Sequence, residues 1–203
     1  MDLESTYNRI AEDWATDHAV DTWWIKDTDK FCSFIKDGST ILDIGCGAGF
    51  KTKYLTDKGF KVTGLDFSEK MIEAARRKYP SLRFDVLDMY DIDKYDANFD
   101  AIFAQAVILH IPKARVLEVL AKMKSRLNHG GLLYLAVKER RKDEPEEGIK
   151  KENDYGYDYE RFFSYFNMHE LHDYMRKLGL ELIWEGVANS GRRNWFQVIG
   201  KKA

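Results

Sequence analysis

Three alternating glycines and a later carboxylate are the residues of this chain whose types and spacing are best suited to chemistry. The apolar run 40–44 leads into Gly45, Gly47 and Gly49, and the next apolar run, 62–65, ends in Asp66. A strand, a glycine turn that opens a helix, and a second strand that ends in an acid form the first half of a nucleotide-binding βαβ unit. The glycines allow tight turns and close approach of a ligand. We expect Asp66 to accept hydrogen bonds from two ribose hydroxyls.

The glycine spacing distinguishes two classes of nucleotide. A dinucleotide fingerprint is Gly-x-Gly-x-x-Gly, and Phe50 stands where its third glycine belongs. From Asp43 onward the chain reads Asp-x-Gly-x-Gly-x-Gly, which resembles motif I of the class I S-adenosylmethionine-dependent methyltransferases. This resemblance implies that Asp43 lies near the ammonium group of the cofactor's methionine part. A pyrophosphate would be repelled by the same carboxylate.

The resemblance also implies cofactor-binding residues at the ends of two further strands, because ligands of such sheets bind at the carboxyl ends. Asp88 would accept the exocyclic amine of adenine, and the backbone of Met89 would meet a ring nitrogen. Gln105 and Ala106 would lie under the methionine part. The alternatives are a turn carboxylate for Asp88 and a self-satisfied loop amide for Gln105.

Apolar side chains near the expected cofactor site form a second set of candidates. Tyr7 and Trp14 lie two turns apart on one face of a predicted helix. Related small-molecule methyltransferases carry a similar N-terminal Tyr segment, which implies a lid over the cofactor. Phe67 and Met71 are expected to pack on the adenine. All four are equally compatible with ordinary core packing, which is common for apolar residues at helical spacing.

Strand and helix signals alternate along the chain and predict an α/β fold. Strands separated by helices pair in parallel, whereas the last two strands are joined too tightly for a crossover and must form a hairpin. Together with the resemblance, this pattern predicts a Rossmann-like seven-stranded mixed sheet of order 3-2-1-4-5-7-6, with the last strand antiparallel and helices on both faces. We expect one domain over 1–203, made of a helical lid (1–37), a cofactor-binding core (38–138), an insertion over the acceptor (139–165), and a C-terminal helix and hairpin (166–203).

The insertion 139–165 differs from the rest of the chain in composition. It holds eight acidic residues between Asp143 and Glu160, together with three tyrosines. One interpretation is a solvated loop. The other is an acceptor site in which Tyr157, Tyr159 and Arg161 bind the acceptor; the acids would favour a cationic or metal-associated acceptor, whereas Arg161 would anchor a carboxylate.

The histidines give one candidate for acid–base chemistry and none for a metal. His110 follows the predicted fourth strand and is a candidate general base, although a histidine bonded to backbone is the alternative. His169 and His172 have no further ligands nearby in the sequence, so we predict no metal site. Methyl transfer from a sulfonium requires mainly alignment and exclusion of water, so a dedicated catalytic residue is not needed.

Composition is consistent with an enzyme domain that acts on small molecules. The 203 residues are 44% hydrophobic and 33% charged, with a net charge of −2, so no general attraction to nucleic acid is expected. The fourth strand also lacks the Asn/Asp-Pro-Pro signature of enzymes that methylate amino groups of nucleic acids. Two cysteines do not form a disulfide framework, and no signal peptide or membrane span is evident, which predicts a cytoplasmic protein without membrane contact.

These observations predict an enzyme that binds S-adenosylmethionine, transfers its methyl group to a small-molecule acceptor, and releases S-adenosylhomocysteine. Two alternatives stay open at this point. One is a nicotinamide-dependent oxidoreductase, which the glycine turn and Asp66 would also suit. The other is a module that binds S-adenosylmethionine without turnover. The acceptor and the oligomeric state are not determined by the sequence.

Overall fold

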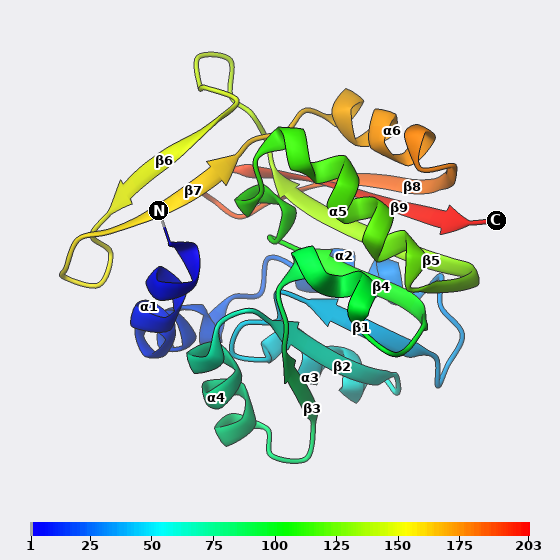
Figure 1. Ribbon diagram of the computed structural model, residues 1–203, viewed down its shortest axis with the longest axis horizontal. Helices are drawn as coiled ribbons and strands as arrows, with labels where there is room; N and C mark the ends of the chain where they lie inside the picture. The colour runs from blue at the N-terminus through cyan, green and yellow to red at the C-terminus, as the bar shows by residue number, and fades with distance from the viewer. Residues whose placement is uncertain (1) are drawn as a thin grey trace.

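The computed structural model describes residues 2–203 and places a seven-stranded sheet at the centre of the molecule (Figure 1). Its strand order is β3-β2-β1-β4-β5-β9-β8, which confirms the predicted order. The strands, in chain order, are β1 (Thr40–Ile44), β2 (Lys61–Asp66), β3 (Arg83–Val86), β4 (Phe99–Gln105), β5 (Leu127–Lys138), β8 (Leu180–Asn189) and β9 (Asn194–Lys202).

The strand pairing follows from the lengths of the connections. β3, β2, β1, β4 and β5 pair in parallel through helical crossovers. β9 pairs antiparallel with both β5 and β8, since the short turn after Asn189 permits only a hairpin. The order of strands changes direction between β1 and β4, so these two strands flank the position where such sheets bind ligands.

Helices cover both faces of the sheet, as predicted. The α-helices are α1 (Leu3–Asp17), α2 (Ile25–Cys32), α3 (Phe50–Asp57), α4 (Glu69–Lys78), α5 (Lys113–Ser125) and α6 (Met168–Lys177). The Ser68 side chain caps α4 by accepting from the Met71 N–H, and Asn167 caps α6 in a reciprocal pair with Glu170. Short 3₁₀ turns, η1 (His18–Val20), η2 (Met89–Lys94) and η3 (Ile108–His110), link other elements.

Neighbouring residues of the central strands point to opposite faces and build two cores. Ile102 of β4 belongs to a buried cluster with residues of α5 and α6, whereas the adjacent Phe103 packs with Phe31 of α2 and stacks on Tyr134 of β5 at 4.6 Å between ring centroids. Both faces of the sheet are therefore closed. Among residues 2–203, no helix is long and apolar enough to cross a membrane.

The insertion forms a second, two-stranded sheet, which the interpretation of 139–165 as a solvated loop missed. β6 (Glu147–Glu152) pairs antiparallel with β7 (Tyr159–Ser164) and projects beside α1 (Figure 1). Ile149 is the only aliphatic residue of β6 and is exposed, so the sequence lacks the apolar alternation of a half-buried strand. Burial of Tyr159 and Phe163 on β7 supplies the packing that holds the hairpin in place.

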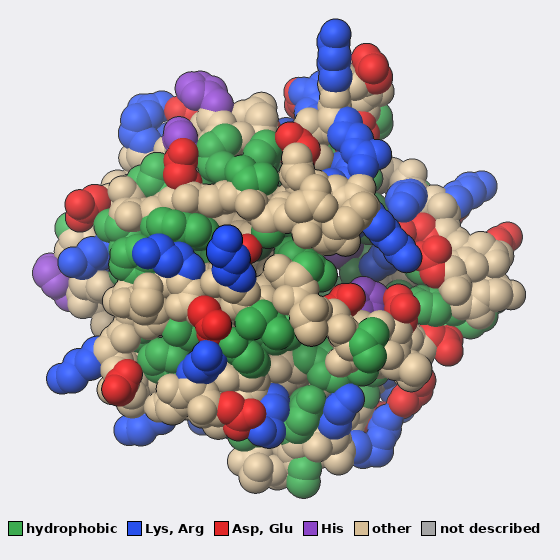
Figure 2. Space-filling view, turned by 180° about the vertical axis from the view of Figure 1, so that it is seen from behind, with side chains coloured by type: hydrophobic (Ala, Val, Ile, Leu, Met, Phe, Trp, Pro, Cys, Tyr) green, Lys and Arg blue, Asp and Glu red, His purple; other side chains and the backbone are tan. Residues whose placement is uncertain are grey.

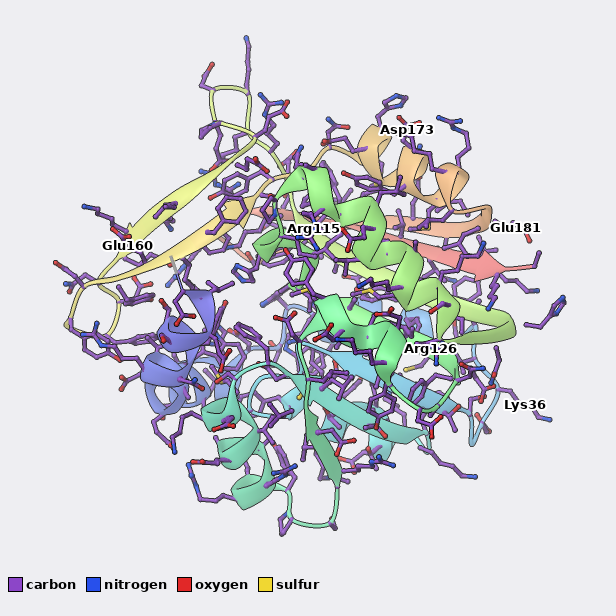
Figure 3. The ribbon with its side chains drawn as sticks, in the orientation of Figure 1. Lys36, Arg115, Arg126, Glu160, Asp173 and Glu181 are labelled. Atoms are coloured by element: carbon purple, nitrogen blue, oxygen red, sulfur yellow. The ribbon has the colours of Figure 1, made fainter. Side chains whose placement is uncertain are left out.

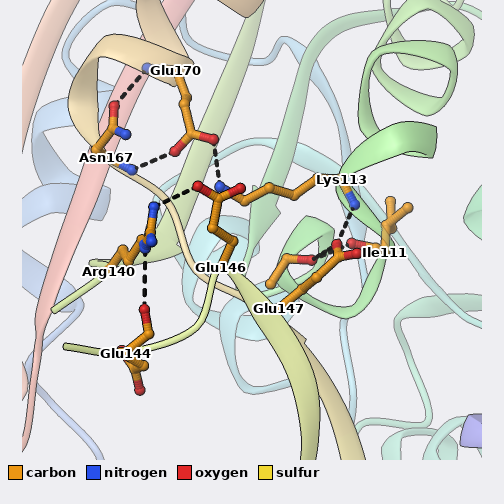
Figure 4. A network of polar contacts seen from close by, with 9 residues as sticks. Ile111, Lys113, Arg140, Glu144, Glu146, Glu147, Asn167 and Glu170 are labelled. Carbon is orange, nitrogen blue, oxygen red and sulfur yellow. Dashed lines mark hydrogen bonds and ion pairs between the residues drawn. The ribbon is translucent and has the colours of Figure 1, made fainter. Parts of the chain in front are cut away.

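A polar network fixes the base of the β6–β7 hairpin to two helices (Figure 4). The carboxylate of Glu147 accepts from the backbone N–H of Lys113 at 2.7 Å, and the side chain of Lys113 forms an ion pair with Glu170 of α6. Ser164 donates to the carbonyl of Ile111 at 2.6 Å. The hairpin therefore has a defined position relative to the end of β4.

Candidate functional site

A cavity of about 900 Å³ lies at the carboxyl ends of the parallel strands, between α1, the glycine turn and the β6–β7 hairpin. The structure brings most of the predicted site residues to its wall: Tyr7, Trp14, Gly45, Gly47, Asp66, Phe67, Met71, Met89, Gln105, Ala106, His110 and Arg161. Five others lie outside the wall: Asp43, Gly49, Asp88, Tyr157 and Tyr159. Segments far apart in the sequence thus meet in one space.

The glycine turn lies against Trp14 of α1. Gly47 has a φ of +52°, and a Cβ atom built on it would approach the Trp14 ring to 2.9 Å. A Cβ on Gly45 would collide with the side chain of Val107. Only glycine combines this left-handed backbone with the available space. Gly49 has another task, since it begins α3 in a left-handed conformation and is not part of the cavity wall.

Asp66 is held in one orientation by two loops. One carboxylate oxygen accepts from the backbone N–H of Gly47 and the other from that of Ser68, both at 2.9 Å. Burial raises the pKa of Asp66 to about 6, against the opposing effect of these N–H donors. Each oxygen retains a further lone pair. The geometry suits a carboxylate that accepts from two hydroxyl groups of a ligand.

Asp43 does not line the cavity, so the structure places it away from the position that the resemblance implied. Its carboxylate accepts from the hydroxyl of Thr52 at 2.6 Å, and burial raises its pKa to about 6. The side chain therefore ties the end of β1 to α3. Its contribution to a ligand site is to position the glycine turn between them.

At the end of β3 the wall is formed by Leu87 and Met89 instead of Asp88. The Asp88 side chain caps η2 by accepting from the N–H of Tyr90 at 2.9 Å, which is the turn role considered as its alternative. Met71 and Phe67 line the same part of the cavity. This apolar part of the wall suits a flat heterocycle such as adenine.

Gln105 is the clearest polar group without a partner. It ends β4, is 4% exposed and lines the cavity, and neither its amide oxygen nor its amide nitrogen has a hydrogen-bond partner in residues 2–203. Buried amides are rarely left unpaired, because desolvation without a hydrogen bond costs roughly 1–3 kcal/mol. Ala106 follows with a φ of +62°. A ligand with polar groups at this strand end would satisfy the amide.

His110 and Tyr7 form a hydrogen-bonded pair at the junction of α1 and η3. The Tyr7 hydroxyl lies 2.8 Å from Nε2 of His110, and Nδ1 lies 2.8 Å from the carbonyl oxygen of Phe162. Because a carbonyl only accepts, Nδ1 carries the proton and Nε2 accepts from Tyr7. Burial lowers the pKa of His110 to about 3. The imidazole is therefore neutral and occupied by two partners.

Arg161 joins the hairpin to α1. Its guanidinium contacts both carboxylate oxygens of Glu152, at 2.6 and 2.9 Å, and donates to the Tyr7 hydroxyl at 3.3 Å. Both side chains of the ion pair are largely buried. The predicted Arg161 is therefore at the cavity, but in a bidentate ion pair within the protein.

Tyr157 and Tyr159 do not line the cavity, and other aromatic residues form its wall. Tyr157 donates to Asp13 of α1 at 2.6 Å, and Tyr159 packs on Tyr155 with ring centroids 5.5 Å apart. Tyr155 itself lines the cavity. Sequence reasoning also missed Lys138, Trp23 and Trp195 in the wall, although the end of β5 was a recognisable signal, since ligands bind at carboxyl ends of strands.

Comparison with known proteins agrees with the fold and the glycine turn. Residues 41–131 match the family model described as a methyltransferase domain. YqeM of Bacillus subtilis, which carries a methyltransferase name, is 35% identical over 102 residues, covering 48% of this chain and 41% of YqeM. A trans-aconitate 2-methyltransferase of Variovorax paradoxus is 28% identical over 111 residues, covering 54% of this chain and 42% of the relative. The chain thus spans about two fifths of the length of these relatives.

A solved structure shows the same fold over nearly the whole chain. The 1,6-didemethyltoxoflavin-N1-methyltransferase of Burkholderia thailandensis, with bound 1,6-didemethyltoxoflavin and S-adenosylhomocysteine, has a TM-score of 0.77 at 17% identity, covering 99% of this chain and 87% of that one. The fold and site define a Rossmann-like methyltransferase domain. The match of residues 41–131 to a methyltransferase domain agrees with the class that the motif predicted. The comparisons give no support to the nicotinamide-dependent oxidoreductase or the non-catalytic module.

Proposed function

We propose that this chain transfers a methyl group from S-adenosylmethionine to a small molecule bound in the same cavity, beside the β6–β7 hairpin. The observation that carries this proposal is the continuity of the cavity, which extends from the glycine turn and Asp66 to Arg161 and Phe163 of the hairpin. When bound, the cofactor supplies an electrophilic methyl group on a positively charged sulfur.

The cofactor would be held by the residues at the strand ends. Asp66 would accept from the ribose hydroxyls, Met89 and Phe67 would contact the adenine, and Gln105 would pair with polar groups of the methionine part. The unpaired amide of Gln105 and the two oriented oxygens of Asp66 support this assignment. Gly45 and Gly47 would allow the backbone to approach the ligand.

The hairpin and α1 would exclude water from the transfer site. Arg161, Tyr7 and His110 connect the two elements through one chain of hydrogen bonds. Since a pKa near 3 makes His110 a weak base at neutral pH, we propose that it orients Tyr7 and does not remove a proton from the acceptor. Alignment of two reactants in a closed site can lower the barrier by roughly 7–11 kcal/mol when the geometry is ideal.

Two measurements test the proposal. Calorimetric titration with S-adenosylhomocysteine and with a reduced nicotinamide dinucleotide should give binding only for the first. Incubation with methyl-labelled S-adenosylmethionine and a fractionated metabolite extract should label a small molecule, and the Asp66→Ala variant should not. Binding of the cofactor without label transfer in any fraction would instead support a binding module.

A further inference from the structure

The half of the cavity beside the hairpin carries an excess of positive charge. From residue 138 onward its wall contains six basic side chains and three acidic ones, Glu144, Glu152 and Asp154. The basic residues are Lys138, Arg141, Lys150, Arg161, Arg192 and Arg193. In the view from behind, Lys and Arg side chains gather beside and above a hollow on this face (Figure 2). The insertion is rich in acidic residues, but the surface that it turns toward the cavity is therefore positively charged.

Strand alternation and ion pairing explain this difference. Glu147 and Glu146 contact Lys113 and Arg140 outside the cavity, and Glu160 on the outer side of β7 is half-exposed (Figure 3). Inside the cavity, Glu152 is bound by Arg161 and Glu144 by Arg193. None of the ion pairs within residues 2–203 includes Lys138, Arg141 or Arg192, and the carboxylates nearest to them, Glu152 and Glu144, are bound by Arg161 and Arg193.

Lys138 is the most enclosed of these three cations. It ends β5, lies opposite Trp195 in the strand register, and places its Nζ atom 4.0 Å from the ring centroid of Phe163. Within residues 2–203, Nζ has no hydrogen-bond acceptor and no ion pair, although an ammonium offers three donors. Contact with a ring face stabilises the charge but satisfies none of the donors. Burial and the neighbouring Arg161 lower the pKa of Lys138 to about 7.

The rings of Phe163 and Trp195, with centroids 4.0 and 5.8 Å from Nζ, lie beside this ammonium, and each packs on a second aromatic ring. The indole of Trp195 stacks on Trp23 with ring centroids 4.8 Å apart, and Tyr165 stacks on Phe163. The Nε1 donor of Trp195, which is 7% exposed, also has no partner in the described chain. Two unpaired donors on paired strands, between flat apolar walls, match a planar molecule with an acidic group.

We propose that the methyl acceptor is a small aromatic carboxylate whose anionic group binds the ammonium of Lys138. This inference rests on the proposed function and names the substrate class of the same site. It differs from the expectation of a cationic acceptor and moves the predicted carboxylate anchor from Arg161, which Glu152 already occupies, to Lys138. The ring of the acceptor would lie among Phe163, Trp195 and Trp23.

Three matched probes test the charge preference. Benzoate, benzamide and benzylamine share one ring and carry a negative, a neutral and a positive group. Each would be titrated into the full chain saturated with S-adenosylhomocysteine, with tryptophan fluorescence as the readout. We expect benzoate to bind at least about tenfold more tightly than benzamide, and benzylamine to bind more weakly still. Equal affinities, no benzoate binding, or a preference for benzylamine would overturn the proposal.

Two variants assign the effect to the side chain. Lys138→Met should reduce benzoate affinity about tenfold and leave benzamide affinity and S-adenosylhomocysteine affinity within about twofold. Lys36→Met removes the same charge from an exposed site on the other side of the molecule from the hairpin and should change none of the three (Figure 3). Unaltered benzoate affinity in Lys138→Met would refute the assignment. Failure of the wild-type chain to bind S-adenosylhomocysteine would instead count against the proposed function.

A pH series on the wild-type chain tests the same group without a substitution. Benzoate affinity should fall between about pH 6 and about pH 9, because Lys138 loses its proton in this range, while benzamide affinity stays constant. The charged groups that face Lys138 are Arg161, Glu152, Lys150, Arg193 and His110. The pKa values of His110 and Glu152 are shifted down and those of the two arginines up, away from the range. A pH-independent benzoate affinity would contradict the proposal.

Discussion

Replacement of Asp66 by Asn should weaken cofactor binding without unfolding the protein. Asp66 is 7% exposed, and its two oxygens each accept one backbone N–H. The Asn side chain keeps one acceptor oxygen and loses the charge. Hydrogen bonds to a charged group are worth roughly 1.5–3 kcal/mol each, so the loss of one such bond to a ribose hydroxyl should weaken S-adenosylhomocysteine binding about tenfold to a hundredfold.

The effect of Asp66→Asn on stability is the difference between two opposing contributions. A pKa raised from 3.8 to about 6 means that the buried charge costs about 3 kcal/mol at neutral pH, at roughly 1.4 kcal/mol for each pH unit. Asn carries no charge, so the variant avoids this cost. It also leaves one backbone N–H without an acceptor, which costs about 1–3 kcal/mol. We therefore expect the free energy of unfolding of the apo protein to change little at pH 7, whereas Asp66→Ala orphans both N–H groups and should be less stable.

The pH dependence separates this explanation from a general loss of structure. The folded state holds the Asp66 proton up to about pH 6, whereas the unfolded state loses it near pH 4, so the wild-type protein gains stability relative to Asp66→Asn as the pH falls through this window. Asp43 is present in both proteins, and its pKa is raised to about 6 by burial and, to a smaller extent, by the charge of Asp66, so its contribution to the pH dependence is smaller in Asp66→Asn. Denaturant unfolding and calorimetry at several pH values give both quantities. Asp96→Asn removes an exposed charge and is the matched control.

Unchanged cofactor affinity in a folded Asp66→Asn protein would refute the assignment of the ribose site. A difference in unfolding free energy that does not vary with pH would refute the argument that burial raises the pKa of Asp66. The two outcomes are independent, because the first is measured with ligand and the second without it.

Four further predictions concern the turn, the hairpin, the histidine and the first helix. Gly47→Val should abolish cofactor binding detectable by calorimetry, since its Cβ would lie 2.9 Å from Trp14 on a backbone with a φ of +52°; normal binding would remove the argument from the glycine turn. Arg161→Met should destabilise the hairpin by about 3 kcal/mol, because it leaves Glu152 buried without its main partner. The double variant Arg161→Met with Glu152→Leu should recover most of this stability, measured as hydrogen-exchange protection of β6 and β7. Equal protection in the single variant and the wild type would count against this prediction. The pKa of His110 is about 3 in the folded state and about 6.5 in the unfolded state. The wild type should therefore lose stability relative to His110→Asn by up to roughly 1.4 kcal/mol for each pH unit below about pH 6.5. Parallel pH profiles of the two proteins in denaturant unfolding would contradict this prediction. Amide exchange of residues 3–14 should slow when S-adenosylhomocysteine binds, and equal rates would reduce Tyr7 and Trp14 to packing residues.

The sequence by itself determined the α/β architecture and the glycine turn. The glycines from Gly45 to Gly49 and the strand-end Asp66 lie close together along the chain, and their roles depend on local backbone geometry. The directions of the strands also followed from local signals, because helical crossovers require parallel pairing and the short last turn requires a hairpin, whereas their order was implied by the family resemblance. Such features are set by periodicity and turn chemistry, which a single sequence displays.

Tertiary structure decided which side chains line the cavity and what charge its acceptor end carries. Asp43 and Asp88 matched a motif but are turned to Thr52 and to the N–H of Tyr90. No signal in the sequence singled out Lys138, because its significance depends on the Phe163 ring beneath it and on the pairing of the nearby Glu152 with Arg161 instead of with Lys138. Composition counts all the acids of the insertion equally, whereas strand alternation and long-range ion pairing determine which of them face a ligand. That sorting depends on contacts between distant segments, and it is therefore a property of the folded chain.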